Sequence, residues 1–174
     1  MPPVPAPPDP AHAFELLTPD HGPELRALFQ GCADYVRMSE GREPSDAQLE
    51  DLFGNVPPGR SAADKAVFGV RRADGRLVGA VELLRAFPEP RDCFLGLQVL
   101  LPEVRGAGLG DRVFRAAEAW ARGEGFTTLY LAVVAQNPRG RAFWERCGFS
   151  EVHRKVCRVG DLDCEVARMV KRLG

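Results

Sequence analysis

The segment that decides the fold is Val99-Leu100-Leu101-Pro102-Glu103-Val104-Arg105-Gly106-Ala107-Gly108-Leu109-Gly110. It completes an almost uninterrupted apolar run from Cys93 to Leu101, which is typical of a central strand covered on both faces. After it, apolar residues recur with helical spacing from Leu109 to Trp120. Glycines allow the backbone to turn tightly and to approach a ligand closely, and the first N–H groups of a helix attract anions. The segment therefore predicts a phosphate site between a buried strand and a helix.

Two other phosphate-binding patterns fail in this segment. The dinucleotide fingerprint needs a third glycine where Asp111 stands, and an acidic residue at the end of the next strand, where residues 131–136 have none. A P-loop needs lysine followed by serine or threonine after Gly110, but Asp111-Arg112 follows. Considered alone, the segment could still be a glycine-rich turn that binds nothing.

The rest of the chain predicts one mixed α/β sheet. A proline-rich, flexible tail is expected over residues 1–10 and a single domain over residues 11–174. The apolar and β-branched runs indicate strands at 13–17, 66–70, 77–84, 93–101, 127–134, 149–159 and 163–173. Helical periodicity indicates helices at 23–36, 45–53, 109–120 and 138–147. Asp74-Gly75 lies between two apolar runs and predicts a hairpin turn.

Composition and charge exclude several classes of function. The formal net charge is −1, which argues against a broad nucleic-acid or membrane surface. No apolar run is long enough to span a bilayer, and the first residues lack the features of a signal peptide. The five cysteines form no C-x-x-C pair and the three histidines are scattered. We therefore expect a cytoplasmic protein with no metal site.

The segment from Val99 to Gly110 closely resembles the acetyl-CoA-binding motif Q/R-x-x-G-x-G/A of the GNAT superfamily of N-acetyltransferases. Downstream, Asn137-Pro138-Arg139-Gly140-Arg141-Ala142-Phe143-Trp144-Glu145-Arg146-Cys147-Gly148-Phe149 resembles the second cofactor-side motif of that family, and Met169 resembles a position in its last hairpin. The match covers Lys65 to Leu173. The resemblance implies an α/β (α+β) fold with a mostly antiparallel central sheet of six to seven strands. The sheet would be splayed at the strand pair that holds coenzyme A and flanked by about four helices.

The resemblance also implies how acetyl-CoA is held. Its pantetheine arm would pair with exposed backbone at Val99 and Leu101, and its pyrophosphate would lie on the amides of the glycine loop. The implied cofactor-binding residues are Val99, Leu100, Leu101, Arg105, Gly106, Ala107, Gly108, Leu109, Gly110, Asn137 and Trp144. For Asn137 the alternative is a plain helix cap before Pro138.

The implied chemistry is direct attack of a primary amine on the thioester through a tetrahedral intermediate. A backbone N–H near Val99 would be the oxyanion donor. Glu82 is the only acidic residue of an apolar strand, so it is either solvated or aimed into a cleft as the base. Asp92 and Gln98 are weaker candidates, and a chain of waters is a further alternative.

Trp144 occupies the position where many GNATs have a tyrosine that protonates the leaving thiolate. An indole N–H cannot release a proton at neutral pH, so Trp144 is not a general acid. Packing in the core, packing on the cofactor arm and a hydrogen bond to the sulfur remain open for it.

The amino-terminal helices should form one wall of the acceptor pocket. Asp34, Tyr35 and Glu40 surround the end of one of them, so we expect them to contact a cationic acceptor, unless they form a solvated helix face. The expected function is an N-acetyltransferase for a primary amine of a small molecule or a protein, with a homodimer left open. The alternatives are a catalytically silent acyl-CoA-binding module and a transferase for a longer acyl group.

Overall fold

A computed structural model describes residues 1–174 as a seven-stranded sheet with helices on both faces. The strands are β1 (His12–Leu16), β2 (Lys65–Arg72), β3 (Leu77–Arg85), β4 (Asp92–Leu100), β5 (Thr128–Val134), β6 (Ser150–Val159) and β7 (Leu162–Arg172). The helices are α1 (Gly22–Gly31), α2 (Ala33–Glu40), α3 (Ala47–Gly54), α4 (Leu109–Gly123) and α5 (Pro138–Arg146). Three short 3-10 turns cover Pro19–His21, Ala62–Asp64 and Pro102–Val104. No helix is long and apolar enough to cross a membrane.

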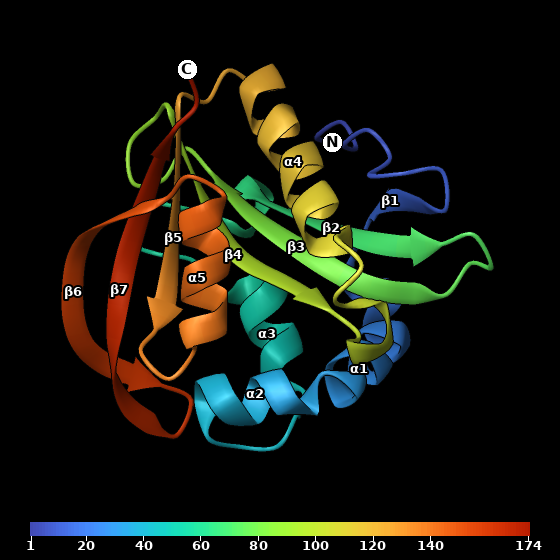
Figure 1. The fold of residues 1–174 in the computed structure, drawn as a ribbon, viewed down its shortest axis with the longest axis horizontal. Helices are drawn as coiled ribbons and strands as arrows, with labels where there is room; N and C mark the ends of the chain where they lie inside the picture. The colour runs from blue at the N-terminus through green and yellow to red at the C-terminus, as the bar shows by residue number, and fades with distance from the viewer.

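The strand order is β1-β2-β3-β4-β5-β7-β6, and only the β4–β5 pair is parallel (Figure 1). This confirms the predicted fold class, a mixed and mostly antiparallel sheet. The hairpin predicted at Asp74-Gly75 joins β2 to β3, as expected. The last hairpin folds back so that β7 lies next to β5, and β6 forms the edge of the sheet.

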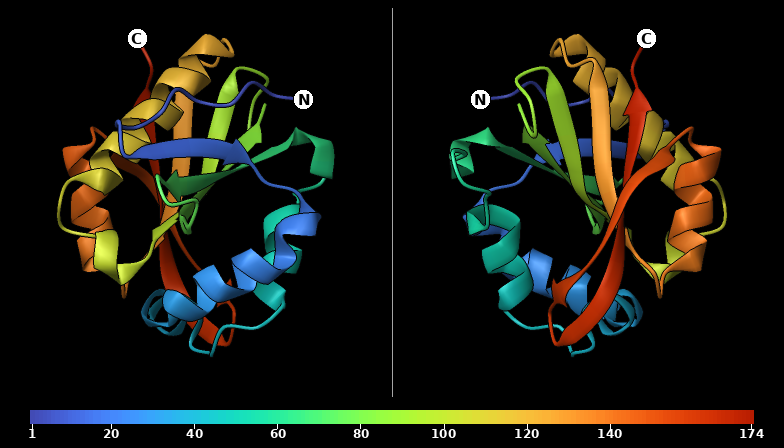
Figure 2. Two further views of the ribbon diagram at one scale, coloured as in Figure 1. Left: turned by 90° about the vertical axis from the view of Figure 1, so that its right-hand side faces the viewer. Right: turned by 90° about the vertical axis from the view of Figure 1, so that its left-hand side faces the viewer.

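The helices form two layers, which Figure 2 shows from the side. One face of the sheet is covered by α4 and α5. The side chains that α4 buries include Val113, Phe114, Ala117 and Trp120. The opposite side holds α1, α2 and α3, where α1 buries Leu25, Leu28 and Phe29. The core therefore lies on both faces of the sheet, as the continuous apolar character of the central strands predicts.

One predicted helix, at residues 23–36, is in fact two. The chain leaves helical geometry at Cys32, with φ −103° and ψ 26°, which ends α1 and begins α2. The Cys32 thiol is buried and donates to the Leu100 carbonyl at 3.4 Å. Apolar spacing could not reveal this break because the helical repeat of buried positions, Leu28, Cys32 and Val36, continues across it. The protein thus has five α-helices where about four were expected.

The amino-terminal segment lies against α4, although the sequence predicts a flexible tail. The Trp120 indole N–H donates to the Pro3 carbonyl at 2.6 Å, and Arg112 bonds to Asp9 at 3.0 Å. Pro5 is buried. These contacts come from a helix more than a hundred residues further along the chain, so local composition could not predict them.

The sheet splits between β4 and β5. The two strands pair only from Asp92↔Thr128 to Leu95↔Leu131, although β4 continues to Leu100. On the other side of β4, the register with β3 shifts from Leu83↔Leu95 to Glu82↔Leu97, so Gly96 is an unpaired bulge residue. The bulge bends β4 away from β5, and Figure 1 shows the two strands diverging. This gap positions the site.

Candidate active site

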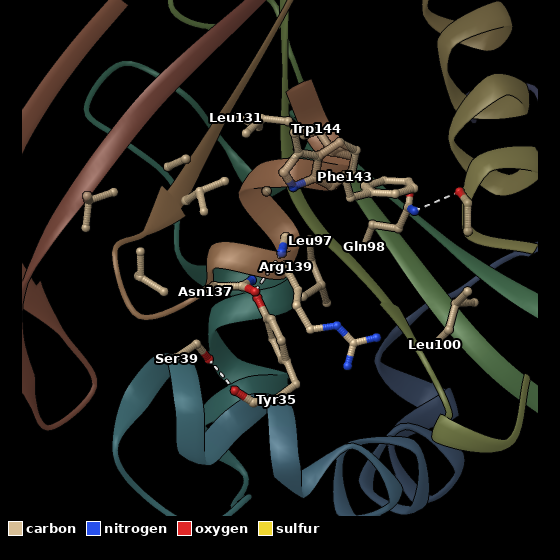
Figure 3. Close-up of a pocket in the computed structure, with 18 of the residues that line it drawn as sticks. Tyr35, Ser39, Leu97, Gln98, Leu100, Leu131, Asn137, Arg139, Phe143 and Trp144 are labelled. Atoms are coloured by element: carbon tan, nitrogen blue, oxygen red, sulfur yellow. Dashed lines mark hydrogen bonds between the residues drawn. The ribbon is translucent and has the colours of Figure 1, made fainter. Parts of the chain in front are cut away.

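A cavity of about 850 Å³ opens where β4 and β5 part; we call it the central cleft (Figure 3). It is lined by β4, β5, the glycine loop, α2 and α5. Two smaller cavities adjoin it: the α3 cavity of about 440 Å³, which contains Glu82 and Lys65, and the α2 cavity of about 330 Å³, which contains Asp34 and Asn137. Tyr35 lines all three cavities. In Figure 3 its ring extends from α2 toward Asn137 at the start of α5.

The glycine loop has the geometry of an anion site. Gly106 and Gly108 have φ angles of +86° and +79°, which favour glycine, and both line the central cleft. Gly108 is the N-cap of α4 and provides no side-chain cap, so the first N–H groups of this 15-residue helix are left for a ligand. The loop therefore fits the pyrophosphate of coenzyme A.

Arg105 lines the central cleft and the α2 cavity, and it is held there by two contacts. Its guanidinium donates to the Asp34 carboxylate at 2.5 Å and to the Leu100 carbonyl at 2.7 Å. The ion pair lowers the pKa of Asp34. Arg105 therefore ties α2 to the end of β4, and Asp34, expected to contact an acceptor, is occupied by this pair. Sequence spacing could not show this pairing, because the two residues are 71 positions apart.

The backbone of β4 that faces the gap is offset by one residue from the expectation. The Leu101 N–H donates to the Val78 carbonyl at 2.8 Å, on the side of β3. Backbone groups alternate in direction along a strand, so those of Val99 also face β3, opposite Ala80. The groups of Gln98 and Leu100 consequently face the gap. The expectation that the backbone of Val99 and Leu101 pairs with the pantetheine arm is therefore wrong, as is the expectation that Val99 is the oxyanion donor. A shift of one residue along a strand reverses the side to which each backbone group points.

Two buried polar atoms near the gap have no partner in the protein. They are Gln98 Oε1, an acceptor, and Gln136 Nε2, a donor, and both residues line the α2 cavity. The amide nitrogen of Gln98 donates to the Gly110 carbonyl at 3.0 Å, which fixes this side chain beside the glycine loop. A pantetheine arm carries two amides, each with a donor and an acceptor, so these orphaned atoms fit that ligand.

Asn137 caps α5 and also lines the central cleft. Its Oδ1 accepts from the Gly140 N–H at 2.9 Å, which is the cap that the sequence left as an alternative. A Cβ on Gly140 would lie 2.3 Å from the Asn137 amide nitrogen, so the helix start requires glycine there. The side chain that caps the helix therefore stands at the cleft wall as well.

Trp144 belongs to an aromatic cluster beneath the cleft. Its ring centroid lies 4.7 Å from Phe143, 5.6 Å from Phe114 and 5.7 Å from Phe149, all in edge-on arrangements. It also lines the central cleft (Figure 3). Of the roles left open by the sequence, core packing is the one these contacts support.

Glu82 lies in the α3 cavity beside the bulge, so its side chain faces a cavity and is not on a solvated face of the sheet. Its carboxylate is 13% exposed and pairs with Lys65 Nζ at 3.3 Å. A Cβ on Gly96 would meet Glu82 Oε2 at 2.8 Å, so the carboxylate packs directly on the bulge residue. Burial raises the pKa of Glu82, and Lys65 acts in the opposite direction. A carboxylate with a raised pKa is suited to accept a proton near neutral pH.

Of the other acidic candidates, Asp92 lies away from the cavities and Glu40 lines two of them. Asp92 lines none of the three cavities; its carboxylate accepts from the Glu89 N–H at 3.3 Å in the turn before β4, so it is no base for this site. Glu40 lines the central cleft and the α3 cavity, with its Oε2 held by Gln48 at 2.8 Å and by Arg42. Burial, followed by the charge of Glu40, raises the pKa of Tyr35.

Among the lining residues that the sequence did not assign to the site are Lys65, Gly96, Gln136 and Arg139. A glycine inside an apolar strand is a known signal for a bulge, so Gly96 could have been found. Lys65 carries no such signal, because a lysine at the start of a strand is usually solvated.

Comparisons with known proteins agree with this geometry. The model of the acetyltransferase (GNAT) family matches residues 23–149. The chain is 28% identical over 161 residues to the uncharacterized N-acetyltransferase YjgM of Escherichia coli (strain K12), covering 91% of this chain and 92% of the relative. It is 27% identical over 132 residues to an aminoglycoside N(6')-acetyltransferase type 1 of Stenotrophomonas maltophilia, covering 72% and 84%.

Among solved structures, a spermidine N-acetyltransferase from Vibrio cholerae in complex with CoA and spermine has the same fold. The TM-score is 0.72 at 20% identity, with 95% of this chain and 97% of that chain covered. The family match extends over well more than half of the chain and includes both the glycine loop and α5. The chain therefore belongs to the acetyltransferase (GNAT) family and is an acetyl-CoA-dependent acyltransferase.

Proposed function

We propose that this protein transfers an acetyl group from acetyl-CoA to a primary amine of a small molecule or a protein. The observation that carries the proposal is the meeting of two cavities at Gly96 and Leu97. The central cleft reaches these residues from the glycine loop, and the α3 cavity reaches them from the side of Glu82. A cofactor and an acceptor could therefore approach the bulge from different directions.

The cofactor would be held by the glycine loop and by β4. The uncapped N–H groups at the start of α4 suit the pyrophosphate, and the gap-facing backbone of Gln98 and Leu100 suits the pantetheine arm. The Leu100 carbonyl already accepts from Arg105 and Cys32, so at this residue the N–H is the group left for a ligand. Bound acetyl-CoA supplies an activated acyl group and a thiolate leaving group.

Glu82 would take the proton of the attacking amine, directly or through a water. It is the acidic group packed against Gly96, at the point where the two cavities meet. The Gln98 N–H faces the gap two residues from the bulge and would donate to the developing oxyanion, in place of Val99. Glu82 lies on β3 and Gln98 on β4, so both groups are positioned by strands and not by a loop.

The acceptor would enter on the side of α2 and α3. Glu40 and Asp51 line both the central cleft and the α3 cavity, and Tyr35 lines these two cavities and the α2 cavity. Carboxylates at this entrance favour an acceptor with more than one cationic group. The named activities of the relatives, on aminoglycosides and on spermidine, are compatible with this chemistry.

Replacing Glu40 by glutamine should raise the KM of a cationic acceptor by about tenfold, since a hydrogen bond to a charged group contributes roughly 1.5–3 kcal/mol. The affinity for acetyl-CoA should not change, and steady-state kinetics with a diamine would show both. The matched control is Glu43→Gln, because Glu43 is exposed, pairs with Arg37 and lines none of the three cavities. Equal KM values for the two variants would remove Glu40 from the acceptor site.

The proposal as a whole is tested by measuring thiol release from acetyl-CoA with a panel of amines. We expect thermal stabilisation by acetyl-CoA and turnover with polycationic amines. Stabilisation without turnover of any amine would indicate a binding module instead, and faster turnover with longer acyl-CoA donors would revise the acyl group. Neutral amines preferred over cationic ones would contradict the assignment of the acceptor side.

A further inference from the structure

Lys65 opens β2 and is almost completely enclosed, with its side chain 5% exposed. Its ammonium group donates to the Asp51 carbonyl at 2.5 Å and to the Leu52 carbonyl at 3.1 Å, and it lies 3.3 Å from Glu82 Oε1. An ammonium group has three N–H bonds, so these three acceptors account for all of them. Lys65 is thus an internal connector between α3 and Glu82.

The partners of Lys65 on α3 are two backbone carbonyls, which are acceptors that suit an ammonium group. The Asp51 and Leu52 carbonyls belong to the last turn of α3, which ends at Gly54. The last carbonyls of a helix have no partner within the helix and form the negative end of its dipole. These carbonyls therefore replace part of the hydration that the Lys65 ammonium group loses when it is buried.

Lys65 is the only cationic side chain among the lining residues of the α3 cavity. The other titratable groups around Glu82 are Asp51 from α3, Glu40 and Tyr35 from α2, and Cys93, whose pKa is raised by burial and in part by Glu82, from β4. Burial, and then the charge of the Asp51 carboxylate, raises the pKa of Glu82 and so favours its protonated form. Lys65 alone opposes that tendency.

We propose that Lys65 is a positioning residue for the acyl transfer, which holds the Glu82 side chain against Gly96 and keeps it as a carboxylate. The inference rests on the proposed role of Glu82 as the base. The Lys65 side chain would thereby connect α3, which forms one side of the acceptor cavity, to the base Glu82. Lys65 lines the α3 cavity and neither the central cleft nor the α2 cavity, so it acts through Glu82.

The test is the pH profile of kcat/KM for Lys65→Gln, which retains N–H donors for the α3 carbonyls and removes the charge. The base must be ionised, and loss of a neighbouring cation favours its protonated form, so the acid limb moves to higher pH. An opposite charge at this distance is expected to be worth about one to three pH units. Activity should therefore fall roughly tenfold or more at the pH of the original limb and recover at higher pH. Lys65→Arg should restore the limb.

Lys171→Met is the matched control for loss of a buried lysine. Lys171 also bonds a carboxylate, Glu118 at 2.5 Å, and a carbonyl, Cys147 at 2.6 Å, and its side chain is 14% exposed. Neither Lys171 nor Glu118 lines any of the three cavities. This variant should lose thermal stability with no movement of the acid limb. An equal limb shift in Lys171→Met would overturn the inference.

The failure of this inference can be told apart from failure of the proposed function. If Glu82→Gln abolishes turnover but Lys65→Gln leaves the acid limb in place, Glu82 is the base and Lys65 does not position it. If Glu82→Gln remains active, the base itself is wrong. Should Lys65→Gln not fold, the charge-conserving variant Lys65→Arg decides: its acid limb should stay at the original pH. An acid limb that moves in Lys65→Arg would refute the inference.

Discussion

Replacing Glu82 by glutamine should lower kcat by about 10²–10⁴-fold, the usual contribution of a positioned general base. The carboxamide has nearly the same shape, so it can remain packed on Gly96, but it cannot accept the proton of the amine. The affinity for acetyl-CoA should be unchanged, because Glu82 lines the α3 cavity and not the glycine loop. The acid limb that belongs to Glu82 should be absent from any residual activity. Stopped-flow thiol release over a range of pH values measures all of these.

Glu118→Gln is the control for this substitution. Glu118 is also buried and paired with a lysine, Lys171, at 2.5 Å, but it lies on α4 outside the three cavities. Both variants leave a buried lysine without its carboxylate, so both should be destabilised. Only Glu82→Gln should lose turnover at a temperature where both proteins are folded. A Glu82→Gln variant with ordinary kcat would show that another group or a chain of waters removes the proton.

Replacing Gly106 by alanine should weaken acetyl-CoA binding by at least about tenfold, which corresponds to about 1.4 kcal/mol. Gly106 lines the central cleft with a φ of +86°, and a Cβ there would have no protein atom within 4 Å. The added methyl group therefore meets no protein side chain, and it occupies space beside the amides that would hold the pyrophosphate. Calorimetry with acetyl-CoA gives the dissociation constant directly.

Gly125→Ala provides the comparison that isolates the ligand effect. Gly125 has the same φ of +86° and also has no atom within 4 Å of an added Cβ, but it lies in the turn after α4 and away from the cleft. Each substitution should cost about 1–2 kcal/mol of stability through the left-handed conformation. The two variants should melt alike, and only Gly106→Ala should bind acetyl-CoA poorly. Equal affinities would place the phosphate groups elsewhere.

The sequence by itself determined the features of this protein that depend on local geometry. Gly106 and Gly108 are needed wherever the chain adopts a positive φ before a helix, and this requirement is visible in the residue type alone. The Asn137 cap before Pro138 is likewise a contact over three residues, and the structure contains it. The order of strands and helices followed from periodicity, because burial on one or both faces leaves a repeating pattern along the chain.

The tertiary structure decided the contacts between distant segments, because pairing across the sheet and burial in a cavity have no local signature. The bulge at Gly96 determines which backbone groups face the gap, and that is why Gln98 and Leu100 replace Val99 and Leu101. Arg105 and Asp34 look like free site residues in the sequence, but the packing of α2 against β4 pairs them with each other. Lys65 resembles a solvated lysine until the end of α3 encloses it beside Glu82. The glycine loop could thus be predicted from residue types, whereas the environment of Glu82 is formed only when distant segments of the chain pack together.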